Sequence, residues 1–593
     1  MTLHSTRGQW LGLLILALTA VRAMGEGSPN RREADLALLN GRIYTAQDWQ
    51  PWARAVAIAG ERIVYAGDAA GEEWKAAVGP HTRMIDLKGR LAVPGIIDSH
   101  THPELVSSTV WHTILPWTMS PDEQLSYLQQ WAKAHPKQPV IYAEYYPTQM
   151  FGPAGPHREL IDRYLPDRAV IWDDFTDHAA CLNSKALRLM GIDRNTPDPQ
   201  PGTAYFVRDA AGNPTGWVKE GAYLDYLPKL FAAVHWTPPD GSETENLGRV
   251  LDELSSYGVV AVFDAWATER ALATVASLDR QHRLKMYYEA AIRFDKLSEL
   301  PDRIAEVRRW QAKYGSQHVR TNTLKLFLDG SNEIATSALL EPFANDPTRS
   351  VETTMSKADL IRSLGLLNDA GLDIHIHMTG DKTFRMALDA VQEARRELGE
   401  RWHIQVTFAH CELISDQDFA RVAPLGVMIN WTPHWSGGYF QGALEPLGQT
   451  RHDQLYRFQP IISSGGIVTF GSDTVSLYEW SRANPYLGMQ IAHTRLDTDA
   501  RYALDGPKKP LSEQLQIRDL VNGYTRNGAM QLRLADRLGT IEPGKLASIV
   551  VLDQDVFVVP ADKIQYTKAD AVIFEGRLVK GALSESDGRQ LSH

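Results

Sequence analysis

Cysteine is nearly absent from this chain of 593 residues, which contains only Cys181 and Cys411. A disulfide framework therefore does not hold the fold together, although one bond between these two residues stays open. The stabilising free energy has to come from burial of apolar surface. Hydrophobic residues make up 44% of the chain, and at this length they suffice for a large core with an accessory domain or two.

Long apolar runs are also missing, except at the N-terminus. Arg7 precedes a run of 12 residues, WLGLLILALTAV, and small residues at 21 and 23 suit cleavage. The run is too short to span a bilayer comfortably, so residues 1–25 are predicted to be a signal peptide. Arg22 is unusual just before a cleavage site, which leaves an N-terminal anchor as the alternative. We expect a periplasmic or secreted protein without stable membrane insertion after signal removal.

Blocks of basic residues are lacking as well. The formal net charge is −11 and is spread along the chain, which argues against nucleic acid as a partner. Charged residues make up 22%, and together with the hydrophobic content this excludes a disordered protein. No internal repeat or low-complexity tract is evident. The composition is typical of a globular protein.

Short alternating runs with turn signals fill both ends of the chain. Residues 34–92 have the pattern of consecutive β-hairpins, and 547–559 and 571–581 repeat it. We therefore predict one small β-sandwich formed by both termini, residues 34–92 plus 540–590.

Between these ends, strand-like runs alternate with helical segments. Eight such runs predict an α/β fold, a (β/α)8 TIM barrel over 93–539, whose exposed helices commonly support a homodimer. The runs are 91–98, 258–265, 285–293, 322–328, 372–378, 404–410, 426–432 and 466–472. About 155 residues separate the first two, far more than a crossover needs, so we expect an inserted capping subdomain at about 104–250.

Polar side chains end several of these runs. His100 and His102 point to one face at the end of the first, because side chains alternate along a strand. Later runs carry Lys325, His375, His377, His410 and Asp473. Any one histidine has a plain explanation as a hydrogen-bonding residue. Five strands of one barrel ending in this way predict a site for zinc or a related divalent metal.

Lys325 is the least expected of these residues. It lies among Leu324, Leu326 and Phe327, where an ammonium group is costly unless it is paired or modified. An ion pair with Asp329 is the simple alternative.

In this order and spacing, several segments resemble the amidohydrolase superfamily: PGIIDSHTHP, KLFLDGS, HMTGD, AHCELI, FGSD and LGTIEPGKLASIVVLD. The resemblance is greatest to the YtcJ-like, amidohydrolase-3 branch, which includes N-substituted formamide deformylases. It runs from about residue 34 to 581 and includes HAACLNSKALRLMGI in the predicted insertion. The chain departs from the branch at Ala547-Ser548, where Ala-Asp is usual, but that position belongs to the predicted β-sandwich.

The resemblance implies two divalent metal ions, with zinc as the default and iron, manganese or cobalt as alternatives. His377 is preferred over His375 as a ligand because HMTGD matches the His-x-x-Gly-Asp pattern of the family. The implied ligands are His100, His102 and Asp473 for one metal, His377 and His410 for the other, and Lys325 between them as a carbamate formed with CO2.

The reaction implied is attack of a metal-activated bridging hydroxide on a C–N bond of a small amide, N-acyl or N-formyl substrate, with Asp473 as proton shuttle. His434 and His178 are further catalytic candidates, each with a structural role as an equal alternative. Tryptophans predicted near the barrel mouth favour an apolar or aromatic substrate: Trp111, Trp117, Trp431 and Trp435.

Two other functions stay open. An esterase, lactonase or carbamate hydrolase would use the same binuclear centre, and a non-catalytic binding protein would keep the fold without turnover. The joint presence of all six ligand positions weighs against the binding protein. Glu220, in GWVKEGAYL, is interpreted as a carboxylate at a helix start.

Overall fold

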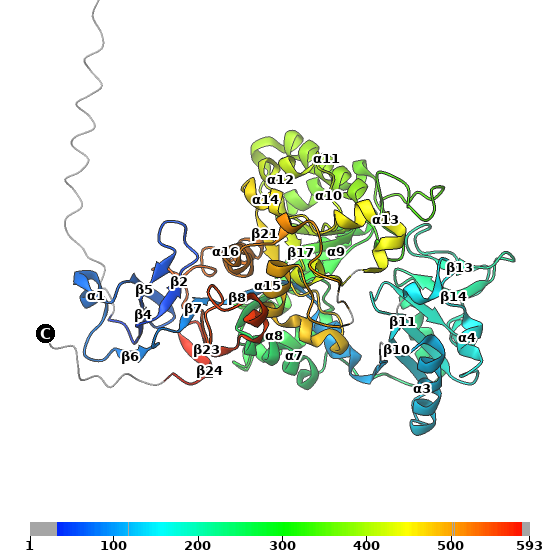
Figure 1. Cartoon of the computed structure of the whole chain (residues 1–593), viewed down its shortest axis with the longest axis horizontal. Helices are drawn as coiled ribbons and strands as arrows, with labels where there is room; N and C mark the ends of the chain where they lie inside the picture. Colours follow the sequence, from blue (N-terminus) through cyan, green and yellow to red (C-terminus); the bar gives the residue numbers. More distant parts are fainter. Residues whose placement is uncertain are drawn as a thin grey trace, which may run out of the picture.

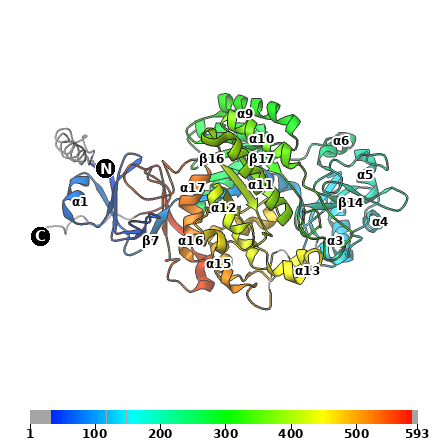
Figure 2. The ribbon, with the colours of Figure 1, turned by 90° about the horizontal axis from the view of Figure 1, so that it is seen from above.

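The computed structural model describes residues 33–583, except 117, 147, 440, 501 and 503. The predicted signal peptide and Trp117 lie outside these residues. Three bodies follow one another along the long axis: a β-sandwich, a central barrel and a subdomain beyond the barrel (Figures 1 and 2). Within the described ranges, no helix is long and apolar enough to cross a membrane.

The central body is built on eight parallel strands whose spatial order follows the chain. Between the last and the first strand, the Ser99 hydroxyl donates to the carbonyl of Phe470 at 2.7 Å, so the sheet curls into a nearly closed barrel. The (β/α)8 prediction is confirmed. The strands are β8 (Ile96–Thr101), β15 (Val259–Asp264), β16 (Tyr287–Arg293), β17 (Val319–Phe327), β18 (Asp373–Met378), β19 (Val406–His410), β20 (Met428–Trp431) and β21 (Val468–Phe470).

Amphipathic helices surround the barrel, and local signals set their ends. In α10, the side chain of Ser356 accepts a hydrogen bond from the Asp359 amide at 3.1 Å, and Gly371 ends the helix in the left-handed conformation. The main outer helices are α7 (Thr244–Ser256), α8 (Glu269–Arg280), α9 (Leu300–Tyr314), α10 (Lys357–Ala370), α11 (Asp381–Leu398) and α12 (Phe419–Leu425).

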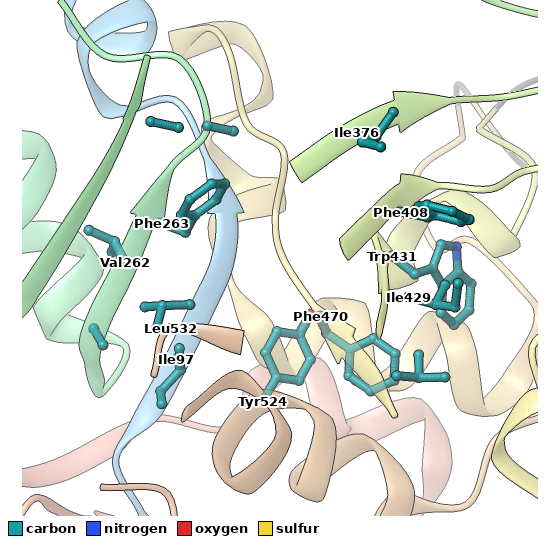
Figure 3. Packing of buried hydrophobic residues seen from close by; sticks show 14 of the residues in the cluster. Ile97, Val262, Phe263, Ile376, Phe408, Ile429, Trp431, Phe470, Tyr524 and Leu532 are labelled. Atoms are coloured by element: carbon teal, nitrogen blue, oxygen red, sulfur yellow. The ribbon is translucent and has the colours of Figure 1, made fainter. Parts of the chain in front are cut away.

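Apolar side chains fill the core around the strands. Phe470 of β21 contacts Tyr524 with 5.3 Å between ring centroids (Figure 3). Trp431 is also buried here, at 4.4 Å from the Phe458 ring, so the expectation that it lies at the mouth is wrong. Its strand, β20, is short, and the residue points into the core and not toward the open end of the barrel.

The subdomain between β8 and β15 has a sheet of its own, ordered β13-β14-β12-β11-β10-β9. We call it the capping subdomain. Apolar clusters pack on both faces of this sheet, so it is a folded unit in itself. Its strands are β9 (Thr113–Ile114), β10 (Val140–Tyr146), β11 (Ala169–Asp174), β12 (Ala179–Leu182), β13 (Phe206–Arg208) and β14 (Pro214–Lys219), with α3 (Pro121–Ala134) and α5 (Ser184–Met190) beside them.

The β-sandwich contains two sheets, ordered β5-β4-β1-β6 and β24-β23-β22-β7-β2-β3. Their strands are β1 (Leu36–Leu39), β2 (Arg42–Tyr44), β3 (Trp52–Ala53), β4 (Ala55–Ala59), β5 (Arg62–Gly67), β6 (Arg83–Asp86), β7 (Leu91–Pro94), β22 (Ile549–Leu552), β23 (Ala569–Phe574) and β24 (Arg577–Gly581). The second sheet joins strands from both ends of the described chain, because β22 (Ile549–Leu552) pairs antiparallel with β7 (Leu91–Pro94). Gly95 links β7 to β8, and a Cβ at this position would lie 2.3 Å from the Val260 side chain.

Cys181 on β12 and Cys411 after β19 are both free and buried.

Candidate metal centre

Three histidines surround the carboxylate of Asp473 at the carboxyl ends of the barrel strands. Asp473 Oδ1 lies 3.4 Å from His100 Nε2 and 3.2 Å from His102 Nε2. Its other oxygen, Oδ2, lies 3.4 Å from Nδ1 of His410. Residues more than 370 positions apart in the sequence are thus brought together at the carboxyl ends of the strands, where TIM barrels carry their active sites.

The backbone holds two of these residues in an uncommon conformation. His410 has φ of 69° and Asp473 has φ of 48°, in the left-handed region that non-glycine residues avoid. Such strain costs about 1–3 kcal/mol per residue and persists only where surrounding contacts enforce it. One such contact is the hydrogen bond from the Asp473 amide to the carbonyl of His100 at 2.8 Å. The strained turn aims the carboxylate at the histidines.

Asn430 fixes the proton on His100. The Asn430 amide nitrogen donates to the Ser99 carbonyl at 3.3 Å and to the Gln531 Oε1 at 3.3 Å, so its oxygen faces His100 Nδ1 at 3.0 Å. His100 Nδ1 therefore carries the hydrogen, and the lone pair of Nε2 is left for a metal. His375 Nε2 also lies near Nδ1, at 3.1 Å, so His375 contacts the far side of His100 and not the carboxylate of Asp473.

His377 is oriented in a similar way. Its Nε2 donates to the carbonyl oxygen of Gly330 at 3.2 Å, which leaves Nδ1 free as a ligand. Its ring centroid lies 4.5 Å from that of His410. Burial lowers the pKa of His100, His375, His377 and His410 well below the usual value for histidine, so these rings are neutral, as metal ligands must be.

Lys325 is completely buried beside this cluster, with Nζ 3.3 Å from His100 Nε2. Burial lowers the pKa of its amine to about 7. The ion pair with Asp329 does not form. The Asp329 carboxylate instead accepts hydrogen bonds from the Thr379 and Gly380 amides at 2.9 and 3.0 Å.

The donors fit a metal ion. Atoms bound to zinc at about 2.0–2.1 Å in a tetrahedron lie about 3.3 Å apart, close to the 3.2–3.4 Å found between Asp473 and the Nε2 atoms of His100 and His102. In the part of the chain that the structure describes, this is the one group of three such donors within 4.8 Å of one another. His102 Nδ1 is buried without a hydrogen-bond partner. The residues present suit a divalent metal.

The structure places the two other catalytic candidates differently. His178 lies beside the metal centre, and His434 is buried among aromatic rings. The His178 ring is 5.8 Å from that of His377, and its Nδ1 is 2.6 Å from Glu220 Oε2. His434 is buried in the 3-10 helix η6 (Pro433–Ser436), where its ring contacts Tyr439 at 5.5 Å. Burial, together with nearby Arg482, lowers the pKa of His434 well below its usual value.

Glu220 is a residue whose role the sequence did not disclose. It follows β14 with φ of 51°, and it is not at a helix start. Its Oε1 accepts a hydrogen bond from the Ser331 amide at 3.1 Å and another from the Thr336 hydroxyl. Burial alone would lower the pKa of His178, but the Glu220 carboxylate raises it to about 9. The signal in the sequence was the segment GWVKEGAYL, which does not indicate a partner for Glu220.

Aromatic rings and a cavity complete the mouth of the barrel. Trp435 stacks on His410 with 5.3 Å between centroids, whereas Trp111 packs within the capping subdomain against Trp236. A cavity of about 630 Å³ lies between the capping subdomain and the ends of β15 and β16, and its lining includes Glu220 and Arg293.

The chain matches a family model described as the amidohydrolase family over residues 83–580. It is 30% identical over 410 residues to the exoenzymes regulatory protein AepA of Pectobacterium carotovorum subsp. carotovorum, covering 68% of this chain and 85% of that one. It is 26% identical over 550 residues to the putative amidohydrolase YtcJ of Bacillus subtilis (strain 168), covering 91% and 98%.

A solved structure of an uncharacterized metal-dependent hydrolase from Pyrococcus furiosus is also similar. The TM-score is 0.62 at 26% identity, with 88% of this chain and 99% of that chain covered. The similarity to YtcJ confirms the predicted branch, and the family match confirms the prediction of a hydrolase. The chain belongs to the amidohydrolase family.

Proposed function

We propose that this protein hydrolyses a C–N bond in a small amide, an N-acyl or N-formyl compound, and that it works outside the cytoplasm because of its N-terminal sequence at 1–25. The observation that carries the reaction is the carboxylate of Asp473 in contact with three histidines at the ends of two barrel strands. The amidohydrolase family acts on small molecules, and the donor set fits its metal-dependent members.

We assign His100, His102 and Asp473 to one divalent metal and His377 and His410 to a second, with zinc as the default. When bound, such ions lower the pKa of a coordinated water toward neutrality and polarise the substrate carbonyl. Asp473 then accepts the proton of the attacking water and gives it to the leaving nitrogen. Its contact with His100, His102 and His410 supports this role.

Lys325 is proposed to carry a carbamate formed from CO2. The reaction needs the neutral amine, and burial, which lowers the pKa of Lys325 to about 7, supplies it near neutral pH. In the described ranges Nζ forms no ion pair within 4 Å, and the charge of Asp473 offsets only part of the effect of burial on the pKa of Lys325. The carbamate would replace a costly buried cation with an anionic oxygen ligand next to His100.

A panel of matched substrates tests the proposed function. The chain is purified with bicarbonate and without chelators, and kcat/KM is measured for aromatic and aliphatic N-formyl amines, N-acetyl amines and the corresponding esters. We expect amides to be turned over at rates comparable to esters. Rapid ester or lactone hydrolysis with no amide turnover would assign the centre to an esterase or lactonase. Ligand binding without any product over long incubation would indicate a binding protein.

His178 and Glu220 are expected to act as one unit. His178 is protonated at neutral pH because its pKa is about 9, so it offers a charged donor to a developing oxyanion. His178→Ala should lower kcat by about 10²–10³-fold, the usual effect of losing such a donor. Glu220→Gln should lower kcat less, and the double variant should be no slower than His178→Ala.

The pH profile provides the second measurement for this pair. A protonated donor is lost as the pH rises through its pKa, so activity should fall above about pH 9 in the unaltered protein. In Glu220→Gln that fall should begin at lower pH, because the carboxylate that raises the pKa is gone. Additive losses and an unmoved profile would show that Glu220 does not act through His178.

A further inference from the structure

Four carboxylates meet where the capping subdomain faces the barrel. Glu144 of β10 and Asp173 of β11 are paired neighbours in the sheet, and Asp177 follows on the next turn with φ of 57°. Glu479 comes from the 3-10 helix η8 (Leu477–Ala483) of the barrel. The stacking of Tyr145 on Tyr478, at 4.0 Å between centroids, joins the two parts beside Glu144 and Glu479. We call Glu144, Asp173, Asp177 and Glu479 the acidic recess.

Basic side chains near the acidic recess are already engaged. Arg482 makes hydrogen bonds of 2.8 and 3.3 Å to Asp497 and lies 3.7 Å from Asp499. His112 Nδ1 contacts Glu144 Oε1. Arg482 is thus paired with Asp497 and Asp499, and in the described ranges it forms no ion pair within 4 Å with a carboxylate of the recess. The carboxyl groups of the recess therefore outnumber the basic groups beside them.

Glu479 is the group that points to a ligand. The residue is 7% exposed, and its Oε1 is buried without a hydrogen-bond partner. Burial raises the pKa of Glu479 to about 8, and the charge of Glu144 acts in the same direction. Glu144 Oε2 is likewise buried without a partner. An unsatisfied buried carboxylate is costly, and two that act on each other indicate a position for a cation.

The recess remains open to solvent. Asp177 is exposed, yet loss of hydration still raises its pKa, with Asp173, Glu144 and Glu479 adding to the effect. Asp177 is thus the residue at which the recess reaches solvent. The one group of three donor atoms close enough for a metal ion, among the residues described, is the His100 group. No three carboxylate oxygens of the recess lie that close together, so an organic cation is a better candidate ligand there than a metal ion.

Aromatic rings connect the acidic recess to the metal centre. Trp435 stacks on His410 at 5.3 Å and on Tyr439 at 6.3 Å. Tyr439 lies 6.3 Å from Phe175, which lies 6.0 Å from Tyr145, the residue after Glu144. These rings form a continuous apolar path between the two sites, and one of them, Tyr439, already contacts the Arg482 guanidinium at 5.4 Å from the ring centroid.

We propose that the acidic recess binds a positively charged amine on the substrate, while the apolar body lies along the aromatic rings and the scissile amide reaches the metal centre. This inference rests on the proposed function for the identity of the reacting group. The substrate class is then an N-acyl or N-formyl derivative of a diamine or of another amine-bearing compound, and neutral amides are poorer substrates.

Binding of a cation tests the recess without any turnover. The probe is protonated benzylamine, with benzyl alcohol as its neutral counterpart, and calorimetry on the metal-loaded protein gives Kd at low and at high salt. We expect benzylamine to bind more tightly and its affinity to fall with salt. Glu479→Gln should weaken it about 30-fold, the usual effect of losing one partner of a buried charge pair. Glu253→Gln, an exposed carboxylate of α7, should change nothing.

Asp177→Asn provides a second variant, because this exposed position tolerates substitution without repacking. Equal affinity for the two probes, or affinity for benzylamine that neither variant reduces, would overturn the recess as a cation site. If benzylamine binds as expected but no amide is hydrolysed, the recess stands and the proposed function fails.

A pair of substrates tests the opposite outcome, in which the protein is a hydrolase but the acidic recess does not bind the substrate. N-Formylbenzylamine and its 4-aminomethyl derivative differ in one ammonium group, and we expect kcat/KM to favour the derivative at least about 10-fold. Glu479→Gln should reduce that ratio through KM. Hydrolysis of both compounds at equal rates, with a ratio that Glu479→Gln leaves unchanged, would retain the hydrolase and reject the recess.

Discussion

Asparagine in place of Asp473 is expected to remove most turnover while most of the metal stays bound. The carboxylate is the proton acceptor of the proposed reaction, and the amide of asparagine cannot accept a proton near neutral pH. Loss of a positioned acid–base group lowers kcat by about 10²–10⁴-fold. Metal is retained because the amide oxygen keeps the shape of the side chain and because His100, His102 and His410 are unchanged around it.

The measurement is kcat and metal content per chain on one preparation of Asp473→Asn. Asp369→Asn, at an exposed position on α10, serves as the matched control and should equal the unaltered protein in both. Near-normal turnover would remove Asp473 from the role of proton shuttle. Loss of metal in proportion to loss of turnover would leave it a ligand and no more.

Much of the barrel could be predicted because its strands carry the information locally. Parallel strands buried on both faces appear as continuous apolar runs, and the run predicted at 372–378 became Asp373–Met378. Polar residues that end such runs must gather at one end of a barrel, so His100, His377, His410 and Asp473 could be placed near one another without knowledge of any contact.

The remaining parts of the site depend on contacts between distant segments. Glu220 reaches His178 only because β12 and β14 pair within the capping subdomain, and its sequence context is also compatible with a helix start. His375 and His377 share a strand face, yet the structure directs one to His100 and the other to Gly330. Alternation along a strand could not separate them.

The acidic recess also depends on contacts between distant segments that the sequence does not reveal. Glu144 and Glu479 lie 335 positions apart, and each looks like an ordinary charged residue in the sequence. Their burial follows from the contact of Tyr145 with Tyr478, which closes the capping subdomain against η8. The substrate selection that we propose for the capping subdomain therefore depends on tertiary contacts that the sequence does not reveal.

Removal of the amine in Lys325→Ala is expected to lower metal content from about two ions per chain to one or fewer and to abolish turnover. The side chain is buried beside His100, so no water-exposed group can take its place as a ligand. Metal is measured by elemental analysis of protein purified with bicarbonate and without chelators. A mass spectrum of the unaltered protein under non-denaturing conditions should show one added CO2.

Lys219 offers a matched control for this prediction. It is also a buried lysine, 3% exposed, and burial lowers its pKa to about 7, but its Nζ donates to the Ile334 carbonyl at 3.1 Å, away from the histidines. Lys219→Ala should therefore keep its metal even if the fold loses stability. One ion per chain in both the unaltered protein and Lys325→Ala would assign a mononuclear site to His100, His102 and Asp473. A bare amine on Lys325 with metal bound would exclude the carbamate. Burial alone would then explain why the pKa of that amine is low.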